Sequence, residues 1–125
     1  MSTSTTITSP PLTELPIELL EAFRARAGEL DRTNGYFHDD LAELAEVGYL
    51  AAAVPAHLGG SGFDLAQMAA SQRRLARYAP ATALAVNMHV YWTGVAADLL
   101  RAGDDSCRFV LERAAAGDVL CALHG

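Results

Sequence analysis

The chain has 125 residues with a net charge of -6, and 51% of its residues are hydrophobic although only 7% are aromatic. This length fits one domain that buries roughly two thirds of its unfolded surface. The acidic balance and the scattered arginines argue against a nucleic-acid partner, since phosphate binding needs clustered Lys and Arg.

Residues 1–15 predict a disordered tail. The sequence MSTSTTITSPP has no basic flank followed by an apolar segment, so it is not a secretory signal. Cys107 and Cys121 are too few for a disulfide framework, and neither pairs with a nearby histidine as a metal site requires. We therefore expect a cytoplasmic protein without a metal site.

Two amphipathic helices are expected in the first half of the chain. Apolar residues recur at helical spacing from Pro16 to about Asp31, and an Asn-Gly pair at 34–35 then marks a turn. A second helix is expected from about His38 to Gly48, where the backbone can turn left-handed. Its acidic side chains are expected on the solvent side: Asp39, Asp40, Glu43 and Glu46.

A glycine-rich loop precedes the third helix. Three glycines lie in the four positions 59–62, so a tight and irregular turn is expected. A phosphate loop is the weaker interpretation, because Asp64 stands where such a loop has Lys-Ser or Lys-Thr. Asp64 and Gln67 instead have capping-box spacing at the start of a helix expected over residues 65–78. Its core-facing side chains are expected to be Leu65, Met68, Ala69 and Leu75.

The segment from Thr82 to Ala102 predicts the central helix of the fold. It carries no charge before Asp98 and is framed by Pro80 and Gly103, which suit the first turn and the C-terminal cap of a helix. A helix that is apolar nearly all round belongs in an interior. The alternative is a membrane span of similar length. Because Ala, Gly and Thr dominate the segment, we expect a buried helix and no membrane partner.

The C-terminal part predicts one more helix and a strand. Asp104 or Asp105 is expected to cap a fifth helix that ends at Gly117, and the apolar run Val119–Leu123 fits a buried strand. A lone strand exposes unpaired backbone groups, so we expect a partner or further sequence beyond Gly125. The expected fold class is all-α, a helical bundle of about five to six helices around a buried central helix.

Several segments, each common by itself, occur in a specific order and spacing. They are Leu44–Tyr49 leading to Val54-Pro55, Leu58–Gly62, Arg74–Ala76, Ala102–Asp105, and Leu111 through Asp118 into the apolar run. In this order the run from Leu41 to Leu123 resembles the N-terminal helical domain of the acyl-CoA dehydrogenase superfamily.

The resemblance implies a helical domain over residues 16–117 and the start of a truncated β-domain over 118–125. In this superfamily three domains surround FAD and an acyl thioester, and the base that removes the α-proton lies in the C-terminal helical domain. The resemblance therefore implies an acyl-CoA or similar substrate, and it places no catalytic residue in this chain, which we expect to be inactive alone. Leu123 is the cofactor-binding candidate, and the full protein is expected to be a homo-oligomer, a tetramer or a dimer.

One face of the central helix is the candidate substrate wall. Asn87, Val90 and Gly94 lie at positions i, i+3 and i+7, and in the resembled family this face lines the acyl cavity. The alternative is structural: Gly94 allows a close helix crossing and Asn87 bonds a neighbouring carbonyl. His89 is either a satisfied core histidine or an acid-base group, and the lack of a nearby carboxylate in the sequence favours the core histidine.

Two other groups also have alternative interpretations. Arg73, Arg74 and Arg77 form a solvated face, or they meet acidic partners or a CoA phosphate. Tyr91 and Trp92 are core or interface anchors, or they stack on the flavin.

The leading hypothesis is the N-terminal domain of an FAD-dependent oxidoreductase similar to acyl-CoA dehydrogenases, which lines the acyl pocket and shields the flavin. The ending His124-Gly125 departs from the usual dehydrogenase pattern and supports a flavin-dependent monooxygenase of the same fold as an alternative. A further alternative is a free-standing helical oligomerisation module.

Overall fold

The computed structural model describes residues 11–121, and within them the chain is all-α, as the sequence predicted. Its elements are α1 (Ile17–Thr33), α2 (His38–Glu46), the 3-10 helices η1 (Tyr49–Ala51) and η2 (Ala56–Leu58), α3 (Leu65–Tyr78), α4 (Pro80–Arg101) and α5 (Arg108–Ala115). The helix bounds agree closely with the expected ones, because most helix ends lie at a local signal in the sequence such as Pro80 or the capping box at Asp64.

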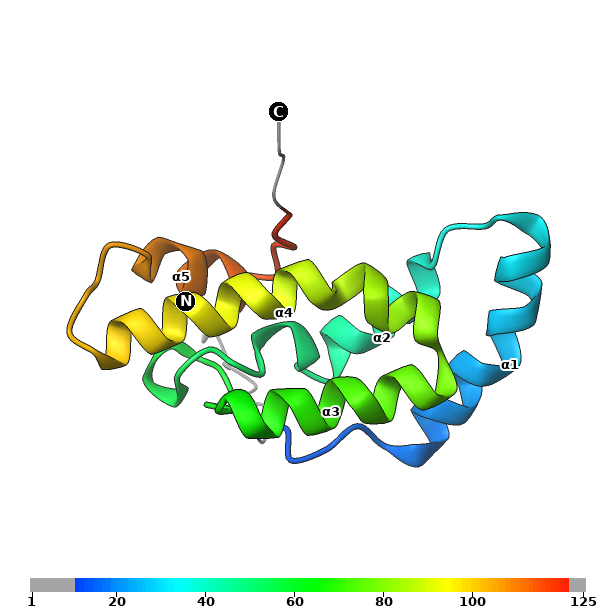
Figure 1. Ribbon diagram of the computed structural model, residues 1–125, viewed down its shortest axis with the longest axis horizontal. Helices are drawn as coiled ribbons and strands as arrows, with labels where there is room; N and C mark the ends of the chain where they lie inside the picture. Colours follow the sequence, from blue (N-terminus) through cyan, green and yellow to red (C-terminus); the bar gives the residue numbers. More distant parts are fainter. Residues whose placement is uncertain (1–10, 122–125) are drawn as a thin grey trace, which may run out of the picture.

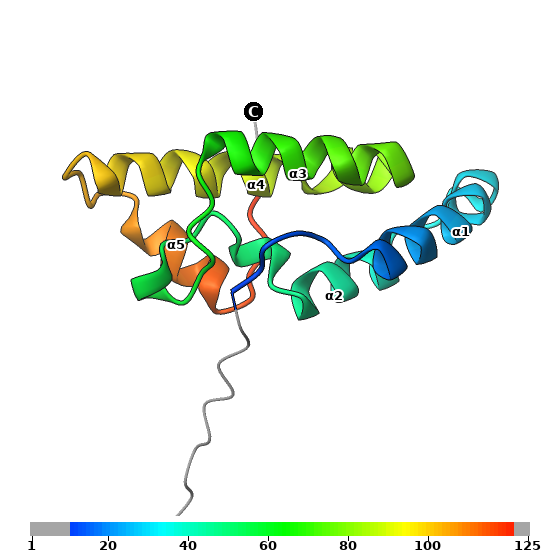
Figure 2. The same cartoon turned by 90° about the horizontal axis from the view of Figure 1, so that it is seen from below.

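α3 and α4 form an antiparallel helical hairpin that organises the fold (Figure 1). Ala79 alone connects the two helices, and Pro80 takes the first position of α4, where a backbone N–H is not needed. Figure 2 shows the hairpin as one layer, with α2 and α5 in a second layer beneath it and α1 reaching out at one end. α4 therefore contacts α3 within its own layer and α2, η1 and α5 below.

The core consists of two clusters of buried side chains, and α4 contributes to both. The first cluster combines side chains from α1, α2, η1, α3 and the N-terminal half of α4, including Leu20, Phe23, Leu44, Leu75 and Val86. The second cluster lies under the C-terminal half of α4 and contains Val54, Ala96, Ala97, Leu111 and Ala114. The predicted central place of α4 is thus confirmed.

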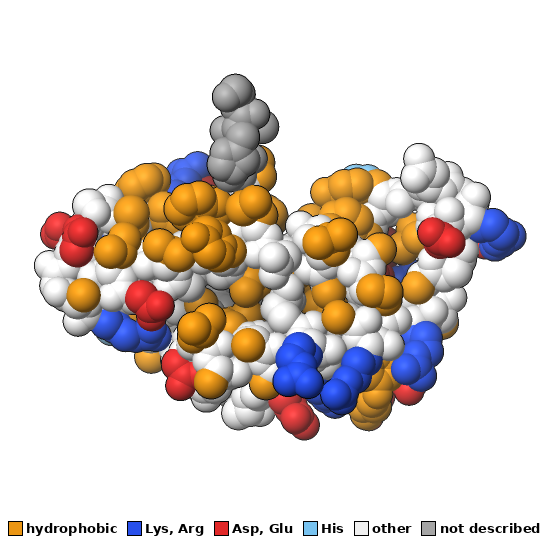
Figure 3. All heavy atoms as spheres, in the orientation of Figure 1, with side chains coloured by type: hydrophobic (Ala, Val, Ile, Leu, Met, Phe, Trp, Pro, Cys, Tyr) orange, Lys and Arg blue, Asp and Glu red, His pale blue; other side chains and the backbone are white. Residues whose placement is uncertain are grey.

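Only one face of α4 is buried, however, which corrects the expectation of a helix buried all round. Leu84 is 76% exposed and Tyr91 is 57% exposed, and Met88 and Trp92 also reach the surface. Figure 3, which views the layer of α3 and α4 face on, shows hydrophobic side chains gathered over it. Among the described residues, the neighbours of α4 cover only one side of this helix. Because its side chains are apolar nearly all round, those on the other side stay exposed.

The described helices include none that is both long and apolar enough to cross a membrane, and this holds for α4 as well.

α3 turns only part of the predicted face to the core. Met68 and Leu75 are buried as expected, whereas Leu65 is 78% exposed and Ala69 is exposed too. Leu65 and Ala69 instead line a groove beside α4. Helical spacing identifies which residues share a face, but the position of the neighbouring helix decides which face is buried.

The helix caps follow the sequence at α3 but not at α5. Oδ1 of Asp64 accepts from the backbone N–H of Gln67, and Oε1 of Gln67 accepts from the N–H of Asp64, each at 2.8 Å. The predicted capping box is therefore confirmed. At α5 the cap position belongs to Cys107, and Oδ1 of Asp104 accepts from the N–H of Ser106 at 2.9 Å in the preceding loop. The hydrogen bonds with Ser106 lower the pKa of Asp104. The prediction that Asp104 or Asp105 caps α5 is therefore wrong.

Asp40 is buried, although the sequence placed it on the solvent side of α2 with the other acidic residues. Nε and Nη2 of Arg26 donate to its Oδ1 at 3.0 and 2.7 Å, and Oγ1 of Thr82 donates to its Oδ2 at 2.7 Å. Hydrogen bonds to Glu43 and Asp40 raise the pKa of Arg26, so its guanidinium stays charged. The buried carboxylate is tolerated because both of its oxygens are bonded, and the network joins α1, α2 and α4.

Residues 11–15, expected as the end of a tail, belong to the folded domain. The backbone N–H of Leu12 donates to Oγ of Ser61 at 2.9 Å, and Leu15 is 1% exposed. At the other end, residues 119–121 form no strand, since a strand needs a partner and the described residues offer none. Leu123 and the other residues of 122–125 lie outside the described residues, as do residues 1–10.

Candidate functional site

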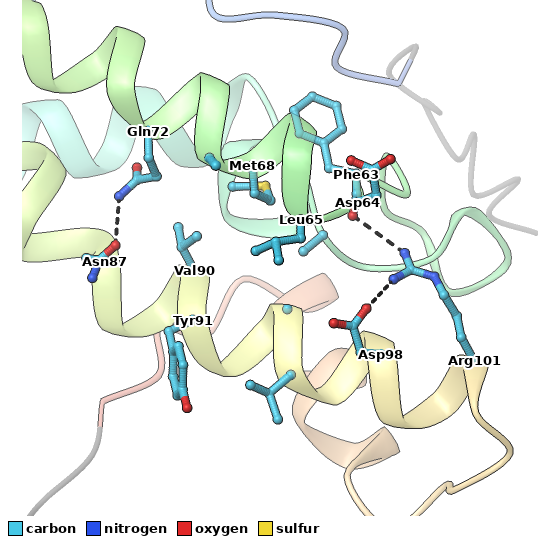
Figure 4. A pocket seen from close by; sticks show the side chains of 14 residues that line it. Phe63, Asp64, Leu65, Met68, Gln72, Asn87, Val90, Tyr91, Asp98 and Arg101 are labelled. Atoms are coloured by element: carbon cyan, nitrogen blue, oxygen red, sulfur yellow. Dashed lines mark hydrogen bonds and ion pairs between the residues drawn. The ribbon is translucent and has the colours of Figure 1, made fainter.

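A groove of about 410 Å³ runs between α3 and α4. Its apolar lining consists of Ala53, Phe63, Leu65, Met68, Ala69, Val90, Tyr91, Gly94 and Val95. Figure 4 shows these apolar side chains between two polar ends, with Gln72 and Asn87 at one end and Asp98 and Arg101 at the other. The volume and the mostly apolar lining are in the range of small-molecule pockets.

The structure brings the three predicted substrate residues, Asn87, Val90 and Gly94, together on this groove. Val90 is half-buried and also packs against the first core cluster. A Cβ added at Gly94 would meet no atom within 4 Å, so this glycine leaves open space rather than allowing a close helix crossing. The helix-crossing interpretation of Gly94 is therefore wrong.

A chain of hydrogen bonds closes one end of the groove. The hydroxyl of Tyr49 donates to Oε1 of Gln72 at 2.7 Å, and Nε2 of Gln72 donates to the carbonyl of Ala83 at 3.1 Å and to Oδ1 of Asn87 at 3.2 Å. Asn87 thus bonds a side chain, and Gln72 is the residue that bonds a carbonyl. Sequence reasoning missed Tyr49 and Gln72, because no local pattern pairs residues from η1, α3 and α4.

Charged side chains lie at the other end of the groove. Nη1 of Arg101 donates to Oδ1 of Asp98 at 2.8 Å, and Nη2 donates to the carbonyl of Phe63 at 3.5 Å (Figure 4). Because Arg101 and Asp98 are both exposed and one turn apart, they form a surface ion pair that is worth little stability. This end differs from the other in offering a charged pair instead of amides.

His89 lies on the buried face of α4 and is 1% exposed. Its Nε2 is 2.6 Å from the carbonyl of Leu50, and its Nδ1 accepts from the backbone N–H of Leu120 at 3.0 Å. A carbonyl only accepts and an N–H only donates, so these partners assign the neutral ring with its hydrogen on Nε2. Burial lowers the pKa of His89, although the bond to Leu50 opposes that shift. His89 is therefore the satisfied core histidine, with neither nitrogen free for acid-base chemistry.

The glycine-rich loop is a tight turn whose amides are already used. The N–H groups of residues 59–62 donate to backbone carbonyls of residues 51–56, and a Cβ at Gly60 would overlap the carbonyl of Val54. A phosphate cradle needs free amides, so this loop does not fit the diphosphate of FAD. The predicted cofactor residue Leu123 lies outside the described range.

The aromatic pair and the arginine run also have defined positions. Tyr91 and Trp92 meet edge to face with ring centroids 5.2 Å apart, and both reach the surface, so they are not core residues. Arg74 is held by the carbonyl of Leu15, while Arg73 and Arg77 are exposed on α3.

Fold and groove together define an all-α domain with an apolar groove between the two helices of an antiparallel hairpin. The chain belongs to the acyl-CoA dehydrogenase family, because the family model for the acyl-CoA dehydrogenase N-terminal domain matches residues 19–118. Comparison with curated proteins and with solved structures gave no match. The resemblance inferred from the sequence is confirmed, and the matched range contains the whole α3–α4 groove.

Proposed function

We propose that this domain forms one wall of the acyl pocket of an FAD-dependent oxidoreductase of the acyl-CoA dehydrogenase type. The groove between α3 and α4 takes the apolar part of the acyl chain. The observation that carries the proposal is the open, apolar floor at Gly94 within the range that matches the family.

In this proposal the groove residues bind the acyl chain and keep water away from it. Each methylene that leaves water for an apolar wall contributes about 0.8 kcal/mol, so a few methylenes against Leu65, Met68, Val90 and Val95 supply useful affinity. The amides of the glycine-rich loop are already used, and we expect the chain alone to be inactive.

The exposed face of α4 supports a role within a larger assembly. Leu84, Met88, Tyr91 and Trp92 are exposed hydrophobic residues of this one helix. Large apolar patches on a surface are typical of interaction sites. In a family enzyme, this face is available to cover the flavin or to contact other domains and subunits.

The test uses the 125-residue chain and octanoyl-CoA, with CoA alone as the control ligand. Binding is followed by NMR shifts of the backbone amides of Val90 and Gly94 and by the fluorescence of the single tryptophan, Trp92. Saturable shifts with octanoyl-CoA and none with CoA alone are expected. Equal shifts with both ligands, or none with either, would contradict an acyl site.

A filling variant sharpens the test. Gly94→Leu places a side chain in the open groove, and we expect at least about a tenfold loss of affinity with the helical CD signal retained. Gly28→Leu is the matched control, because Gly28 is also helical and a Cβ there meets nothing within 4 Å. Unchanged affinity in Gly94→Leu would show that the ligand lies elsewhere.

A further inference from the structure

At the end of the groove formed by Gln72 and Asn87, the hydrogen-bond partners determine which way each amide group is turned. The carbonyl of Ala83 can only accept, so Gln72 must turn its NH2 group toward it, at 3.1 Å. Oε1 of Gln72 then faces Tyr49, and the hydroxyl of Tyr49 must donate to it, at 2.7 Å. One backbone carbonyl thus decides the orientation of both side chains.

The same logic extends to Asn87. Nε2 of Gln72 donates its second hydrogen to Oδ1 of Asn87, and the nitrogen and oxygen atoms are 3.2 Å apart (Figure 4). Asn87 must therefore keep its oxygen toward Gln72, which leaves both hydrogens of its own NH2 group outside the chain of bonds. Asn87 is exposed and lines the groove, so this NH2 group is available to a ligand.

The orientation does not depend on pH in the physiological range. Tyr49 is 1% exposed, and burial raises its pKa to about 12. Its hydroxyl therefore keeps its hydrogen and remains a donor. Three charged residues line the groove, Asp64, Asp98 and Arg101, and all lie at the opposite end (Figure 4). Asp98 pairs with Arg101, and Asp64 accepts from the backbone N–H of Gln67. None of them competes with Gln72 for Asn87.

We infer that Asn87 is an oriented hydrogen-bond donor that selects acyl chains carrying a hydrogen-bond acceptor, such as a carbonyl oxygen, at the position beside it. Gln72 and Tyr49 are its positioning residues. This inference rests on the proposed function, since it requires an acyl chain in the groove. It adds a substrate class, acyl groups with an oxygen acceptor along the chain.

The experiment compares octanoyl-CoA with a series of oxooctanoyl-CoA thioesters in which the keto oxygen moves along the chain. One hydrogen bond contributes a net 0.5–1.5 kcal/mol, so the best-placed oxo compound should bind about twofold to tenfold tighter than octanoyl-CoA. The side-chain NH2 resonances of Asn87 should shift with that compound and not with octanoyl-CoA. This spectroscopic signature separates donation by Asn87 from a general change in affinity.

Variants test whether the hydrogen bonds from Tyr49 through Gln72 orient the NH2 group of Asn87. Asn87→Asp keeps the shape and still accepts from Gln72 but has no donor, so the preference for the oxo compound should vanish. Tyr49→Phe leaves Asn87 intact and removes one of the three hydrogen bonds that hold Gln72, so the preference should weaken. Asn34→Asp makes the same chemical change at an exposed residue outside the groove, so it is the control and should keep the preference. Because Asn87 is exposed, Asn87→Asp remains informative even if Tyr49→Phe does not fold.

The outcomes separate the inference from the proposed function. If octanoyl-CoA binds and the oxo compounds bind no better, or if Asn87→Asp keeps the preference, the donor role is overturned and the acyl wall stands. If neither octanoyl-CoA nor any oxo compound binds, the acyl wall itself is wrong and the donor role fails with it.

Discussion

The backbone N–H of Leu120 donates to Nδ1 of His89 across 3.0 Å, so the segment after α5 is joined to the middle of α4. The other ring nitrogen bonds the carbonyl of Leu50 at 2.6 Å. A proton added at Nδ1 would face the N–H of Leu120, and two donors cannot bond each other. The bond that joins this segment to α4 therefore depends on a neutral His89.

This arrangement predicts acid sensitivity. The folded pKa of His89 is lowered by burial, whereas the unfolded chain binds a proton near pH 6.5. The unfolded state thus binds more protons between these two values, and the stability present above about pH 6.5 is lost as the pH falls through the folded pKa. Urea unfolding at about pH 7.5 and about pH 5.5 should show the loss.

Two variants assign this pH dependence. His89→Gln keeps one donor and one acceptor but does not titrate, so the difference between the two pH values should shrink. His57→Gln, at an exposed histidine, should retain the full difference. An unchanged difference in His89→Gln would mean that another group is responsible.

The buried carboxylate of Asp40 predicts a large cost on removal. Breaking a buried ion pair typically costs about 3–5 kcal/mol. We expect Asp40→Ala to lower the free energy of unfolding by about 2–3 kcal/mol, since the Arg26 side chain is 30% exposed and keeps Glu43 as a partner. Asp39→Ala, on the exposed side of the same turn, should cost about 0.5 kcal/mol. Urea unfolding of both variants measures the two costs. Similar losses of unfolding free energy in Asp40→Ala and Asp39→Ala would contradict the buried network.

We expect opposite effects from alanine at two glycines, Gly60 in the glycine-rich loop and Gly28 in α1. A Cβ at Gly60 would overlap the carbonyls of Val54 and Ala51, so Gly60→Ala should cost at least about 2 kcal/mol. Gly28 is helical with open space around it, so Gly28→Ala should stabilise the domain by about 0.5–1 kcal/mol. Thermal unfolding followed by CD checks both, and a lower Tm is expected for the first variant and a higher one for the second.

The two faces of α4 predict different responses to truncation. Val86 is 1% exposed and Leu84 is 76% exposed. Val86→Ala should therefore lower the free energy of unfolding by about 2 kcal/mol, and Leu84→Ala should change it by less than about 0.5 kcal/mol. A large loss in Leu84→Ala at low protein concentration would show that this face is covered. Sedimentation of the same sample would then show whether a second copy covers it.

The sequence by itself determined the helices and the family. Pro80 and the Asp64–Gln67 capping box mark helix ends through contacts within one turn, so they act the same in any tertiary setting. The order of these local signals was also enough to indicate the acyl-CoA dehydrogenase N-terminal domain. The common face of Asn87, Val90 and Gly94 followed from helical spacing alone.

Only the tertiary structure decided which faces are covered and which polar groups are joined. Asp40 can be buried because Arg26 and Thr82 bond its carboxylate. These partners are 14 and 42 residues away in the sequence and lie on two other helices. Tyr49 reaches Gln72 on α3 across 23 residues. Such pairings have no local signature, because a helix presents all its faces equally until its neighbours bury one of them and leave the others to water.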